Sequence, residues 1–360
     1  MRRIFFLADD LCSGGAERQM VTLACLLKQR CYDVSVYCYG KADFYADILR
    51  RSNVPIIWEY APNYLKRIIK VRKHIRNNKY DAVISFLPTC NFLNNISAIG
   101  GKSWKVITGE RSARTSSFTT LRGKLFNWLQ RYSDYIVCNS HNAASGWKRY
   151  MPEFNDKLRV IYNIVTLGKI DSEYIPKVDG KIHIVVAATY QFLKNPLGLI
   201  DALMLMNEEQ RENIVIDWYG RKNVGGDCQA YDRSLELIQK YGIGDILHLN
   251  ADTKDIANIM NKADAVMLLS WVEGLPNVIC EAMTIGKPII MSRVSDYSTL
   301  VDDENGFLCD WDKPDTIKEA IVSMANCDCT QLKQMGRASK EKSGKLFSAE
   351  TVIQQWKNLL

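Results

Sequence analysis

The chain has 360 residues, 47% of them hydrophobic and 24% charged, which is typical of a globular protein with apolar material for about two domains. No apolar run is long enough to span a membrane, and the eleven cysteines and four histidines lack the spacing of a metal site. This composition predicts reduced thiols in a cytosolic protein and excludes a membrane-spanning or disulfide-rich one.

The net charge of +7 is unevenly distributed along the chain. Residues 1–175 contain 27 Lys and Arg against 14 Asp and Glu, a balance of +13, whereas the remaining residues contain 20 against 26, a balance of −6. Positive charge gathered in one half indicates an anionic partner, either nucleic acid or a membrane surface. The sequence contains no recognisable nucleic-acid-binding module, so we expect the membrane surface and no nucleic acid.

Short β-rich runs alternate with helical patterns along the whole chain. In the first half the expected strands are RIFFLA, DVSVYCY, PIIWEY, DAVISFL, KVIT, YIVCNS and LRVIYN, with helices near 17–30, 43–51 and 63–78. After a polar segment, residues 166–181, which reads as a linker, the expected strands are HIVVAAT, NIVIDWYG, ILHLN, AVMLLS, PIIMS and GFLCD. This alternation predicts an α/β protein with two parallel sheets, each covered by helices.

We therefore expect an N-terminal Rossmann-like domain over residues 1–170, a second one over 171–345, and a final helix over 346–360. The final segment, AETVIQQWKNLL, places Val352, Trp356 and Leu359 or Leu360 on one side, so it can pack against either domain. In open parallel sheets ligands bind beyond the carboxyl ends of the strands. The loops that follow strands are therefore where functional residues are expected.

One such loop reads SWVEGLPNVICEAMTIGKPII, residues 270–290, and follows the strand AVMLLS. Glu273 lies in the turn, and Glu281 lies inside the helix that begins near Pro276, so both carboxylates can face one pocket. The unpaired amides at the helix start favour an anion or a hydroxyl-rich ligand, and Gly274 permits close approach. The alternative is a pair of surface glutamates, the first of them stabilised by the helix dipole.

The pattern E-G-L-P-x-x-x-x-E resembles the E-x7-E signature of retaining glycosyltransferases of family 4, which have the GT-B fold of two Rossmann-like domains facing across a cleft. Further segments agree in order along nearly the whole chain. They are SGGAERQ, ISFLPTCN, VCNS and VIYN in the first half, and AATYQFLKN and ENGFL in the second. The resemblance is to members that assemble bacterial surface glycans or lipid-linked oligosaccharides.

The resemblance implies roles at the matching positions. Glu273 would hold the donor sugar near its reacting carbon, and Glu281 would bind the ribose hydroxyls of the nucleotide. The backbone of Gly274, Leu275 and Pro276, together with Asn277, would contact the donor. Gly14 and Gly15, in the loop DDLCSGGAE after the first strand, would line the opposite side of the cleft near the donor phosphates and the acceptor. A tight turn alone would also explain the glycine pair.

The same resemblance places a cationic pair, an arginine and a lysine five residues apart, at the donor diphosphate. Lys194 matches the lysine, but the position of the arginine is Thr189. Arg221, in WYGRK after the next strand, is a candidate for the missing charge. A cation there would stabilise the negative charge that grows on the leaving group. A solvated lysine at a helix start is the alternative for Lys194.

Relatives commonly carry a histidine after the strand that corresponds to KVIT. Here the segment at this place is ITGERSARTSS, residues 107–117. Glu110 and Arg111 stand near that place. Arg111 could bind phosphate or a charged sugar and Glu110 could orient it, although a structural ion pair explains both residues as well. An arginine cannot act as a base at neutral pH.

The string DWD at 310–312 matches the D-x-D motif of metal-dependent transferases, but its context indicates a strand end followed by a helix cap, so we expect no metal and no other cofactor.

In NYLKRIIKVRKHIRNNK, residues Tyr64, Ile68, Val71 and Ile75 form an apolar stripe at helical spacing. The remaining face carries Lys66, Arg67, Lys70, Lys73 and Arg76, and with the region Arg114–Arg131, including Phe118, Phe126 and Trp128, it is expected to attract anionic lipid.

Taken together, these expectations describe a metal-independent hexosyl- or N-acetylhexosaminyl-transferase at the inner face of the membrane. A nucleotide sugar, with UDP as the favoured carrier, would donate to a lipid-linked glycan acceptor with retention of configuration. Two other readings are open: a nucleotide-sugar epimerase of the same two-sheet architecture, and a non-catalytic protein that binds nucleotide sugars.

Overall fold

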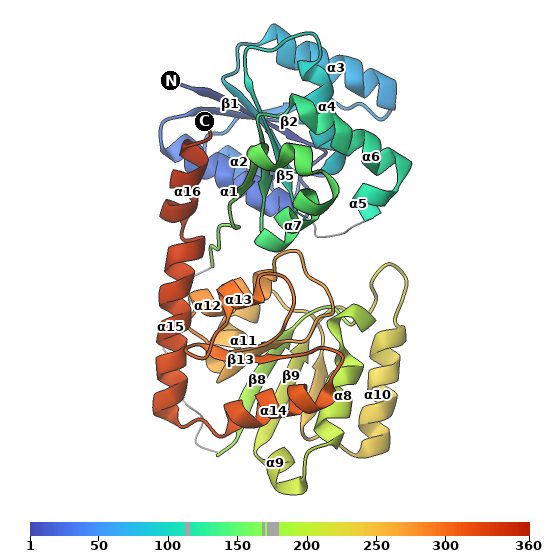
Figure 1. The fold of residues 1–360 in the computed structure, drawn as a ribbon, viewed down its shortest axis with the longest axis vertical. Helices are drawn as coiled ribbons and strands as arrows, with labels where there is room; N and C mark the ends of the chain where they lie inside the picture. The colour runs from blue at the N-terminus through green and yellow to red at the C-terminus, as the bar shows by residue number, and fades with distance from the viewer. Residues whose placement is uncertain (112–115, 168–169, 171–179) are drawn as a thin grey trace. The chain divides into compact units, whose positions relative to one another are not determined.

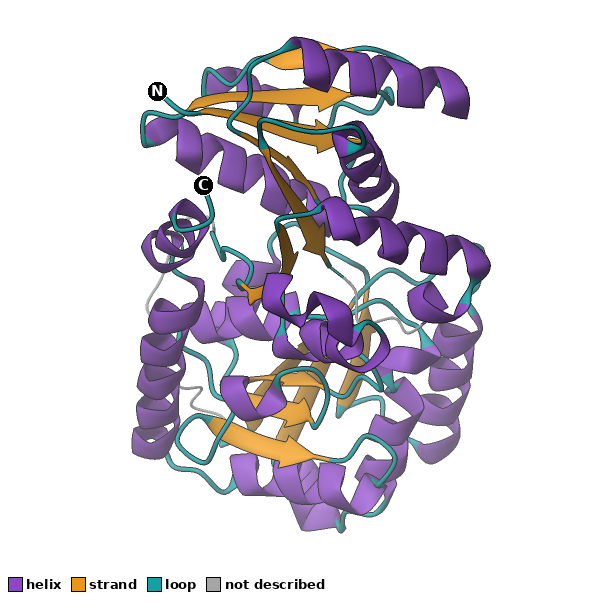
Figure 2. Ribbon diagram, turned by 45° about the horizontal axis from the view of Figure 1, so that its top comes forward, coloured by secondary structure: helices purple, strands orange, loops and turns teal. Residues whose placement is uncertain are grey.

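The computed structural model describes residues 1–111, 116–167, 170 and 180–360. The chain divides into two compact units, one made of Met1–Ile164 with Ala349–Leu360 and the other of Val165–Ser348. In each unit helices cover a parallel sheet (Figure 1), and Figure 2 shows the sheets and their helical layers from a second direction. This is the predicted α/β architecture. Most of the predicted linker, and Arg114, lie outside the described residues.

The sheet of the first unit has the order β3-β2-β1-β4-β5-β6-β7 among the described residues, with every pairing parallel. The strands are β1 Arg3–Ala8, β2 Asp33–Cys38, β3 Ile56–Trp58, β4 Ala82–Ser85, β5 Lys105–Glu110, β6 Tyr135–Cys138 and β7 Leu158–Val160. The helices are α1 Gly15–Gln29, α2 Ala46–Arg51, α3 Tyr64–Asn77, α4 Pro88–Ala98, α5 Ser116–Thr119, α6 Leu121–Trp128, α7 His141–Tyr150 and α16 Ala349–Lys357, with 3₁₀ turns η1 Leu129–Tyr132 and η2 Pro152–Lys157.

The sheet of the second unit has the order β10-β9-β8-β11-β12-β13, again with parallel pairings. The strands are β8 Ile182–Ala187, β9 Ile214–Tyr219, β10 Leu247–Asn250, β11 Ala265–Leu268, β12 Ile289–Ser292 and β13 Gly306–Cys309. The helices are α8 Pro196–Met204, α9 Glu208–Glu212, α10 Gln229–Tyr241, α11 Ile256–Lys262, α12 Asn277–Thr284, α13 Tyr297–Leu300, α14 Pro314–Ala325 and α15 Cys329–Phe347, with the 3₁₀ turn η3 Phe192–Lys194.

The strand order of each sheet reverses once, because consecutive strands first add to one edge and then to the other. The reversal falls between β1 and β4 in the first unit and between β8 and β11 in the second. At such a point the loops leaving the two neighbouring strands diverge and open a crevice at the carboxyl edge of the sheet, where ligands of doubly wound folds bind. The loops after these four strands are therefore the places to look for a site.

The last helix, α16, completes the core of the first unit. Its predicted apolar stripe is buried, since Val352 and Trp356 are at most 2% exposed, and Trp356 packs 5.9 Å from the Phe86 ring. The Nζ atom of Lys105 on β5 donates to the carbonyl of Leu359 at 3.0 Å. The chain thus returns to its first unit after passing through the second.

Helix α3 buries Val71 and Ile75 as its stripe predicts, but three of its predicted outward cations have partners within the protein. Lys70 forms an ion pair with Glu59 at 3.4 Å. Arg76 donates to the carbonyls of Ser97, Ile99 and Gly101, at the end of α4. Arg67 donates to the Ala61 carbonyl and lies 4.3 Å over the Tyr39 ring. Carbonyls at a helix end need donors, and long arginine side chains reach them. The outward basic face of α3 is therefore smaller than predicted.

Lys287, between α12 and β12, is a buried lysine of the second unit, only 1% exposed. Its Nζ atom donates to the carbonyls of Asn261 and Ala263, which close the end of α11. Burial lowers the pKa of Lys287 to about 7 from its usual 10.5. The lysine thus terminates one helix at the cost of a desolvated amine.

This lowered pKa predicts a pH dependence of stability. Between pH 7 and 10.5 the unfolded chain holds a proton on Lys287 that the folded chain has released, so stability from this group rises with pH. Relative to Lys287→Met, the wild type is expected to gain on the order of 2 kcal/mol of unfolding free energy between pH 7 and pH 9. Urea unfolding at several pH values measures the difference.

The matched control is Lys333→Met, because Lys333 is exposed on α15 and its loss should leave the pH profile unchanged. Parallel stability curves for the wild type and Lys287→Met across this pH range would contradict the prediction.

Candidate active site

At the reversal point of the second unit, the structure brings Lys194 and Glu273 together. Lys194 ends η3 after β8, and Glu273 follows β11; the Nζ and Oε1 atoms lie 2.5 Å apart. Ser270 Oγ donates to the same carboxylate oxygen at 2.7 Å. The side chains of Lys194 and Glu273 are only 19% and 15% exposed, so the pair is substantially shielded from water. An ion pair in such surroundings is much stronger than one on an open surface.

Backbone contacts hold the two loops against each other. The amide of Trp271 donates to the carbonyl of Leu193 at 2.8 Å, which joins the loop after β11 to the turn that carries Lys194. Ser292 Oγ, at the end of β12, donates to the Ser270 carbonyl at 2.8 Å. Ser295, in the left-handed region at φ 56°, donates to the Gly274 carbonyl at 2.5 Å. Sequence patterns gave no sign of Ser295, because only the fold shows its backbone conformation.

Helix α12 begins at Asn277, one residue later than predicted, with Pro276 as its N-cap. The side chains of Leu275 and Pro276 are buried, so these two residues can offer a ligand only their backbone. Asn277 and Glu281 are half-buried and four residues apart, which places them on one face of the helix. The Ile279 and Cys280 amides donate to the Pro276 carbonyl at 3.0 and 3.2 Å, and the positive end of the helix dipole makes this helix start suited to an anion.

The structure places Arg221 beside Thr189, the position where the cationic pair lacks its arginine. The amide of Tyr190 donates to the Arg221 carbonyl at 3.0 Å, and Gly220 fits tightly against Ala188 and Thr189. The side chain of Arg221 makes only a loose contact with Asp252. The Arg221 Nε and Asp252 Oδ2 atoms are 3.9 Å apart, and both side chains are more than 60% exposed. Because exposed pairs at this distance contribute little, the guanidinium can turn toward another anion at small cost.

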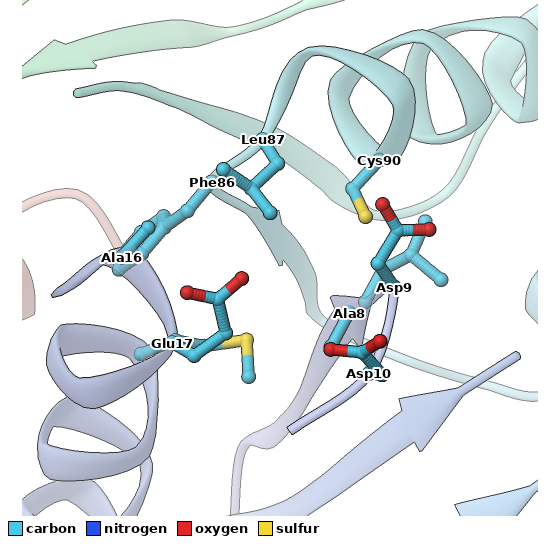
Figure 3. Close-up of a pocket in the computed structure, with 10 residues that line it drawn as sticks. Ala8, Asp9, Asp10, Ala16, Glu17, Phe86, Leu87 and Cys90 are labelled. Carbon is cyan, nitrogen blue, oxygen red and sulfur yellow. The ribbon is translucent and has the colours of Figure 1, made fainter. Parts of the chain in front are cut away.

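The reversal point of the first unit forms a small pocket, drawn in Figure 3. Asp9 and Asp10 follow β1, Glu17 belongs to α1, and Phe86 and Cys90 come from the segment after β4. The cavity volume is about 10 Å³, which is room for about one water molecule or one hydroxyl group. Its carboxylates were not among the predicted site residues, although the DD of ADDL directly after the first strand was a visible signal.

Gly14 and Gly15 mark the start of α1, with Gly14 as N-cap. A Cβ atom at Gly14 would lie 2.0 Å from a carboxylate oxygen of Glu17, so the glycine makes room for that side chain folded over the helix start. The sequence left two explanations for the glycine pair, which were ligand approach and a tight turn. The structure adds a third reason for the pair, which is the position of Glu17 at the pocket.

Arg111 is half-buried, and its guanidinium packs within the first unit. Its guanidinium lies 3.8 Å from the centre of the Phe86 ring, and Nη1 donates to Asn163 Oδ1 at 3.0 Å. Its Nε atom has no hydrogen-bond partner among the described residues, and burial lowers the pKa of Arg111 to about 10. Glu110 is half-buried on β5, and its carbonyl accepts from the Asn139 amide.

The DWD string does not provide the predicted cap of helix α14. The N-cap of α14 is Lys313, and its side chain makes no capping hydrogen bond. Instead, the two oxygens of Asp310 accept from Arg293 at 3.1 Å and Lys313 at 2.9 Å.

In the described part of the chain, Asp10, Cys12 and Glu17 form a group close enough to bind a metal ion. Burial raises the pKa of the Cys12 thiol to about 11, which makes it a poor ligand at neutral pH.

Two family models match consecutive parts of the chain. Residues 13–169 match the family described as Glycosyltransferase Family 4, and residues 169–342 match Glycosyl transferases group 1. The junction falls within the segment predicted as a linker.

Curated relatives span the chain at low identity. One is the Campylobacter jejuni GalNAc-alpha-(1->4)-GalNAc-alpha-(1->3)-diNAcBac-PP-undecaprenol alpha-1,4-N-acetyl-D-galactosaminyltransferase, 23% identical, covering 100% of this chain and 98% of that protein. Another is the Escherichia coli UDP-Gal:alpha-D-GlcNAc-diphosphoundecaprenol alpha-1,3-galactosyltransferase, 25% identical over 87% of this chain and 85% of that one. A third, amylovoran biosynthesis glycosyltransferase AmsD of Erwinia amylovora, is 21% identical over both full lengths.

Solved structures share the fold. Anabaena HepE in complex with UDP and glucose superposes with a TM-score of 0.81 at 17% identity and covers 99% of both chains. The apo form of the lipopolysaccharide outer core galactosyltransferase WaaB superposes at 0.79 and 14% identity, covering 100% of this chain and 99% of that one.

Proposed function

Because the chain belongs to the GT-B glycosyltransferases of family 4, we propose that it transfers a sugar from a UDP-sugar to a lipid-linked glycan acceptor, with retention of configuration, in the synthesis of a surface glycan. The observation that carries the proposal is the convergence of Lys194, Glu273 and the start of α12 on the reversal point of the second sheet. Two relatives whose names contain undecaprenol-linked sugars support the acceptor class. Hexosyl and N-acetylhexosaminyl transfer both fit this site.

Each group has a task in this reaction. The amides of α12 and the Lys194 ammonium hold the donor diphosphate and stabilise its charge as it leaves. Glu273 accepts hydroxyls of the donor sugar, and Glu281 accepts those of the ribose. The acceptor oxygen bonds to the anomeric carbon on the face from which the diphosphate departs, and the acceptor proton passes to a phosphate oxygen. These reaction steps retain the configuration at the anomeric carbon and require no metal.

The acceptor is assigned to the first unit. Carboxylates suit sugar hydroxyls, and Asp9, Asp10 and Glu17 border the pocket at that unit's reversal point (Figure 3). The charge of +13 in residues 1–175 suits the diphosphate of a lipid-linked glycan and the anionic membrane in which its lipid is held.

A docking surface for that membrane is proposed on helices α3 and α6, which lie on either side of α4 in Figure 1. No helix in the described part of the chain is long and apolar enough to cross a bilayer. Leu65 and Ile69 on α3, and Leu121 and Leu125 on α6, are each more than half exposed and lie one helical turn apart. Phe118 and Phe126, predicted to help, instead pack on Trp147 and Phe92.

Exposed cations accompany these apolar side chains, including Lys66 and Lys73 on α3 and Arg122 on α6. Apolar side chains that enter the headgroup layer and cations that attract anionic lipid are the two elements of interfacial binding. These features support the proposal that the enzyme binds an anionic membrane surface, which we take to be the cytosolic leaflet.

Glu273→Gln tests the transfer reaction. With UDP-galactose or UDP-N-acetylgalactosamine and an undecaprenyl-diphosphate-linked sugar, the variant should lose transfer by about a hundredfold or more, because the neutral amide no longer holds the donor sugar or balances Lys194. Glu319→Gln, at an exposed position on α14, is the control and should retain full activity. Thermal melts of both variants establish folding. Unchanged transfer by Glu273→Gln would exclude this site, and donor conversion without acceptor would indicate an epimerase.

Arg221→Ala tests the missing cation of the diphosphate site. Turnover should fall by about tenfold to a hundredfold, because one charge that stabilises the leaving group is lost. The double variant Thr189→Arg with Arg221→Ala should recover part of that loss, since the backbones of the two positions are adjacent. Arg233→Ala, on the exposed face of α10, serves as control. Full activity of Arg221→Ala would refute the assignment.

Vesicle sedimentation tests the membrane surface. The wild type should bind phosphatidylglycerol vesicles, and Lys66→Ser with Lys73→Ser should weaken binding about tenfold or more, at about 1 kcal/mol per cation. Leu65→Ser with Ile69→Ser should weaken it without altering charge, whereas Leu205→Ser in the second unit should not. Equal binding of all variants, or equal binding to neutral vesicles, would argue against this surface.

A further inference from the structure

Two tryptophans lie beside the Lys194–Glu273 pair and have no part in the proposal above. Trp271 follows β11 and Trp311 follows β13; they are 41% and 37% exposed, and their ring centroids are 5.2 Å apart with an interplanar angle of 37°. The other tryptophan of the second unit, Trp218, is fully buried. Large aromatic side chains are usually withdrawn from water, so an exposed pair at one place indicates a contact surface.

The backbone ties this aromatic pair to the turn that carries Lys194. The Trp271 amide donates to the Leu193 carbonyl at 2.8 Å, and the side-chain amide of Asn195 donates to the Trp311 carbonyl at 2.7 Å. The two tryptophans are therefore anchored through the residues directly before and after Lys194. Trp271 also lies only two residues before Glu273.

Asn195 is the residue that joins these parts. It is 6% exposed, it has a left-handed backbone at φ 65°, and its Oδ1 atom caps α8 by accepting from the Gly198 amide at 3.3 Å. Its other side-chain group is the one that binds Trp311. One buried amide thus fixes the start of α8 and the Trp311 backbone together, which makes the aromatic surface a fixed part of the site.

Resting on the proposed function, we propose that Trp271 and Trp311 form a stacking surface for the apolar face of a pyranose ring bound next to Glu273. A pyranose presents C–H groups on its faces and hydroxyls at its edge. The faces match the rings of the two tryptophans, and the hydroxyls match the carboxylate and the ammonium. The surface would act on sugar specificity, because an axial hydroxyl on the stacked face would disturb the contact.

The ring can come from the donor sugar or from the terminal sugar of the acceptor, and the experiment separates these sources. The protein is labelled with 5-fluorotryptophan, and the ¹⁹F resonances of the two residues are assigned with Trp271→Phe and Trp311→Phe. The probes are UDP, UDP-galactose, UDP-N-acetylgalactosamine and the methyl α-glycosides of galactose and N-acetylgalactosamine. Trp58, 40% exposed on β3, gives the reference resonance.

Shifts at Trp271 and Trp311 with the UDP-sugars but not with UDP would assign the surface to the donor sugar. Shifts with the glycosides but not with the UDP-sugars would assign it to the acceptor sugar. No shift with any sugar probe, or equal shifts with UDP alone, would overturn the proposal. The glycosides make this readout independent of the donor, so a wrong nucleotide would not be mistaken for a wrong surface.

Kinetics provides a second readout. Trp271→Ala and Trp311→Ala should each raise the KM or Kd of the stacked sugar about tenfold while the Kd for UDP stays unchanged, and the Phe variants should recover part of the loss. Trp58→Ala is the matched control. Alanine variants that only melt earlier, with unaltered sugar constants, would show a purely structural role. Loss of all transfer by Glu273→Gln with no effect at either tryptophan would refute this inference and leave the proposed function standing.

Discussion

The ion pair of Lys194 and Glu273 is the contact on which the second unit's site depends. It joins the loops after β8 and β11, the two strands at which the sheet order reverses. Because both side chains are largely withdrawn from water, either one without the other would be a poorly solvated charge. In the proposed function, a bound nucleotide sugar would offer each a replacement, since its phosphates suit the ammonium and its hydroxyls suit the carboxylate. The resting pair would then keep both groups in place until the proposed donor exchanges with it.

In both halves of the chain, single groups at the strand ends carry charges opposite in sign to the net charge of that half. Residues 1–175 are basic, yet the pocket after β1 is bordered by Asp9, Asp10 and Glu17. The remaining residues are acidic, yet the loops after β8 and β9 carry Lys194 and Arg221. The electrostatic field of a whole surface attracts a charged partner, whereas single charged groups at strand ends bind the reacting groups of that partner. In the proposed function, the basic half would attract an anionic lipid carrier while its pocket receives a neutral hydroxyl.

The sequence was sufficient to predict the strands, because buried parallel strands are continuous apolar runs such as RIFFLA. It was also sufficient to bring Lys194 and Glu273 to one edge, because strand ends converge in this fold. Contacts that depend on packing between distant segments were not predictable. Arg76 is exposed, as predicted, but it also donates to carbonyls at the end of α4, which its spacing did not indicate. Glu17 folds over Gly14, and Asn195 links α8 to Trp311, in arrangements that no spacing rule contains.

Phe86 shows how such packing reaches the pocket of the first unit. Its ring lines the pocket, with the Arg111 guanidinium 3.8 Å away and Trp356 of the last helix 5.9 Å away. A Cβ atom at Gly109 would lie 2.5 Å from the same ring, so β5 admits it only because that residue is glycine. Arg111 thus helps to position Phe86, and its role as a ligand for phosphate stays a prediction. The position of Phe86 in the pocket wall thus depends on β5 and on α16, which lies at the far end of the chain. The residues close to the pocket in sequence therefore do not define its shape alone.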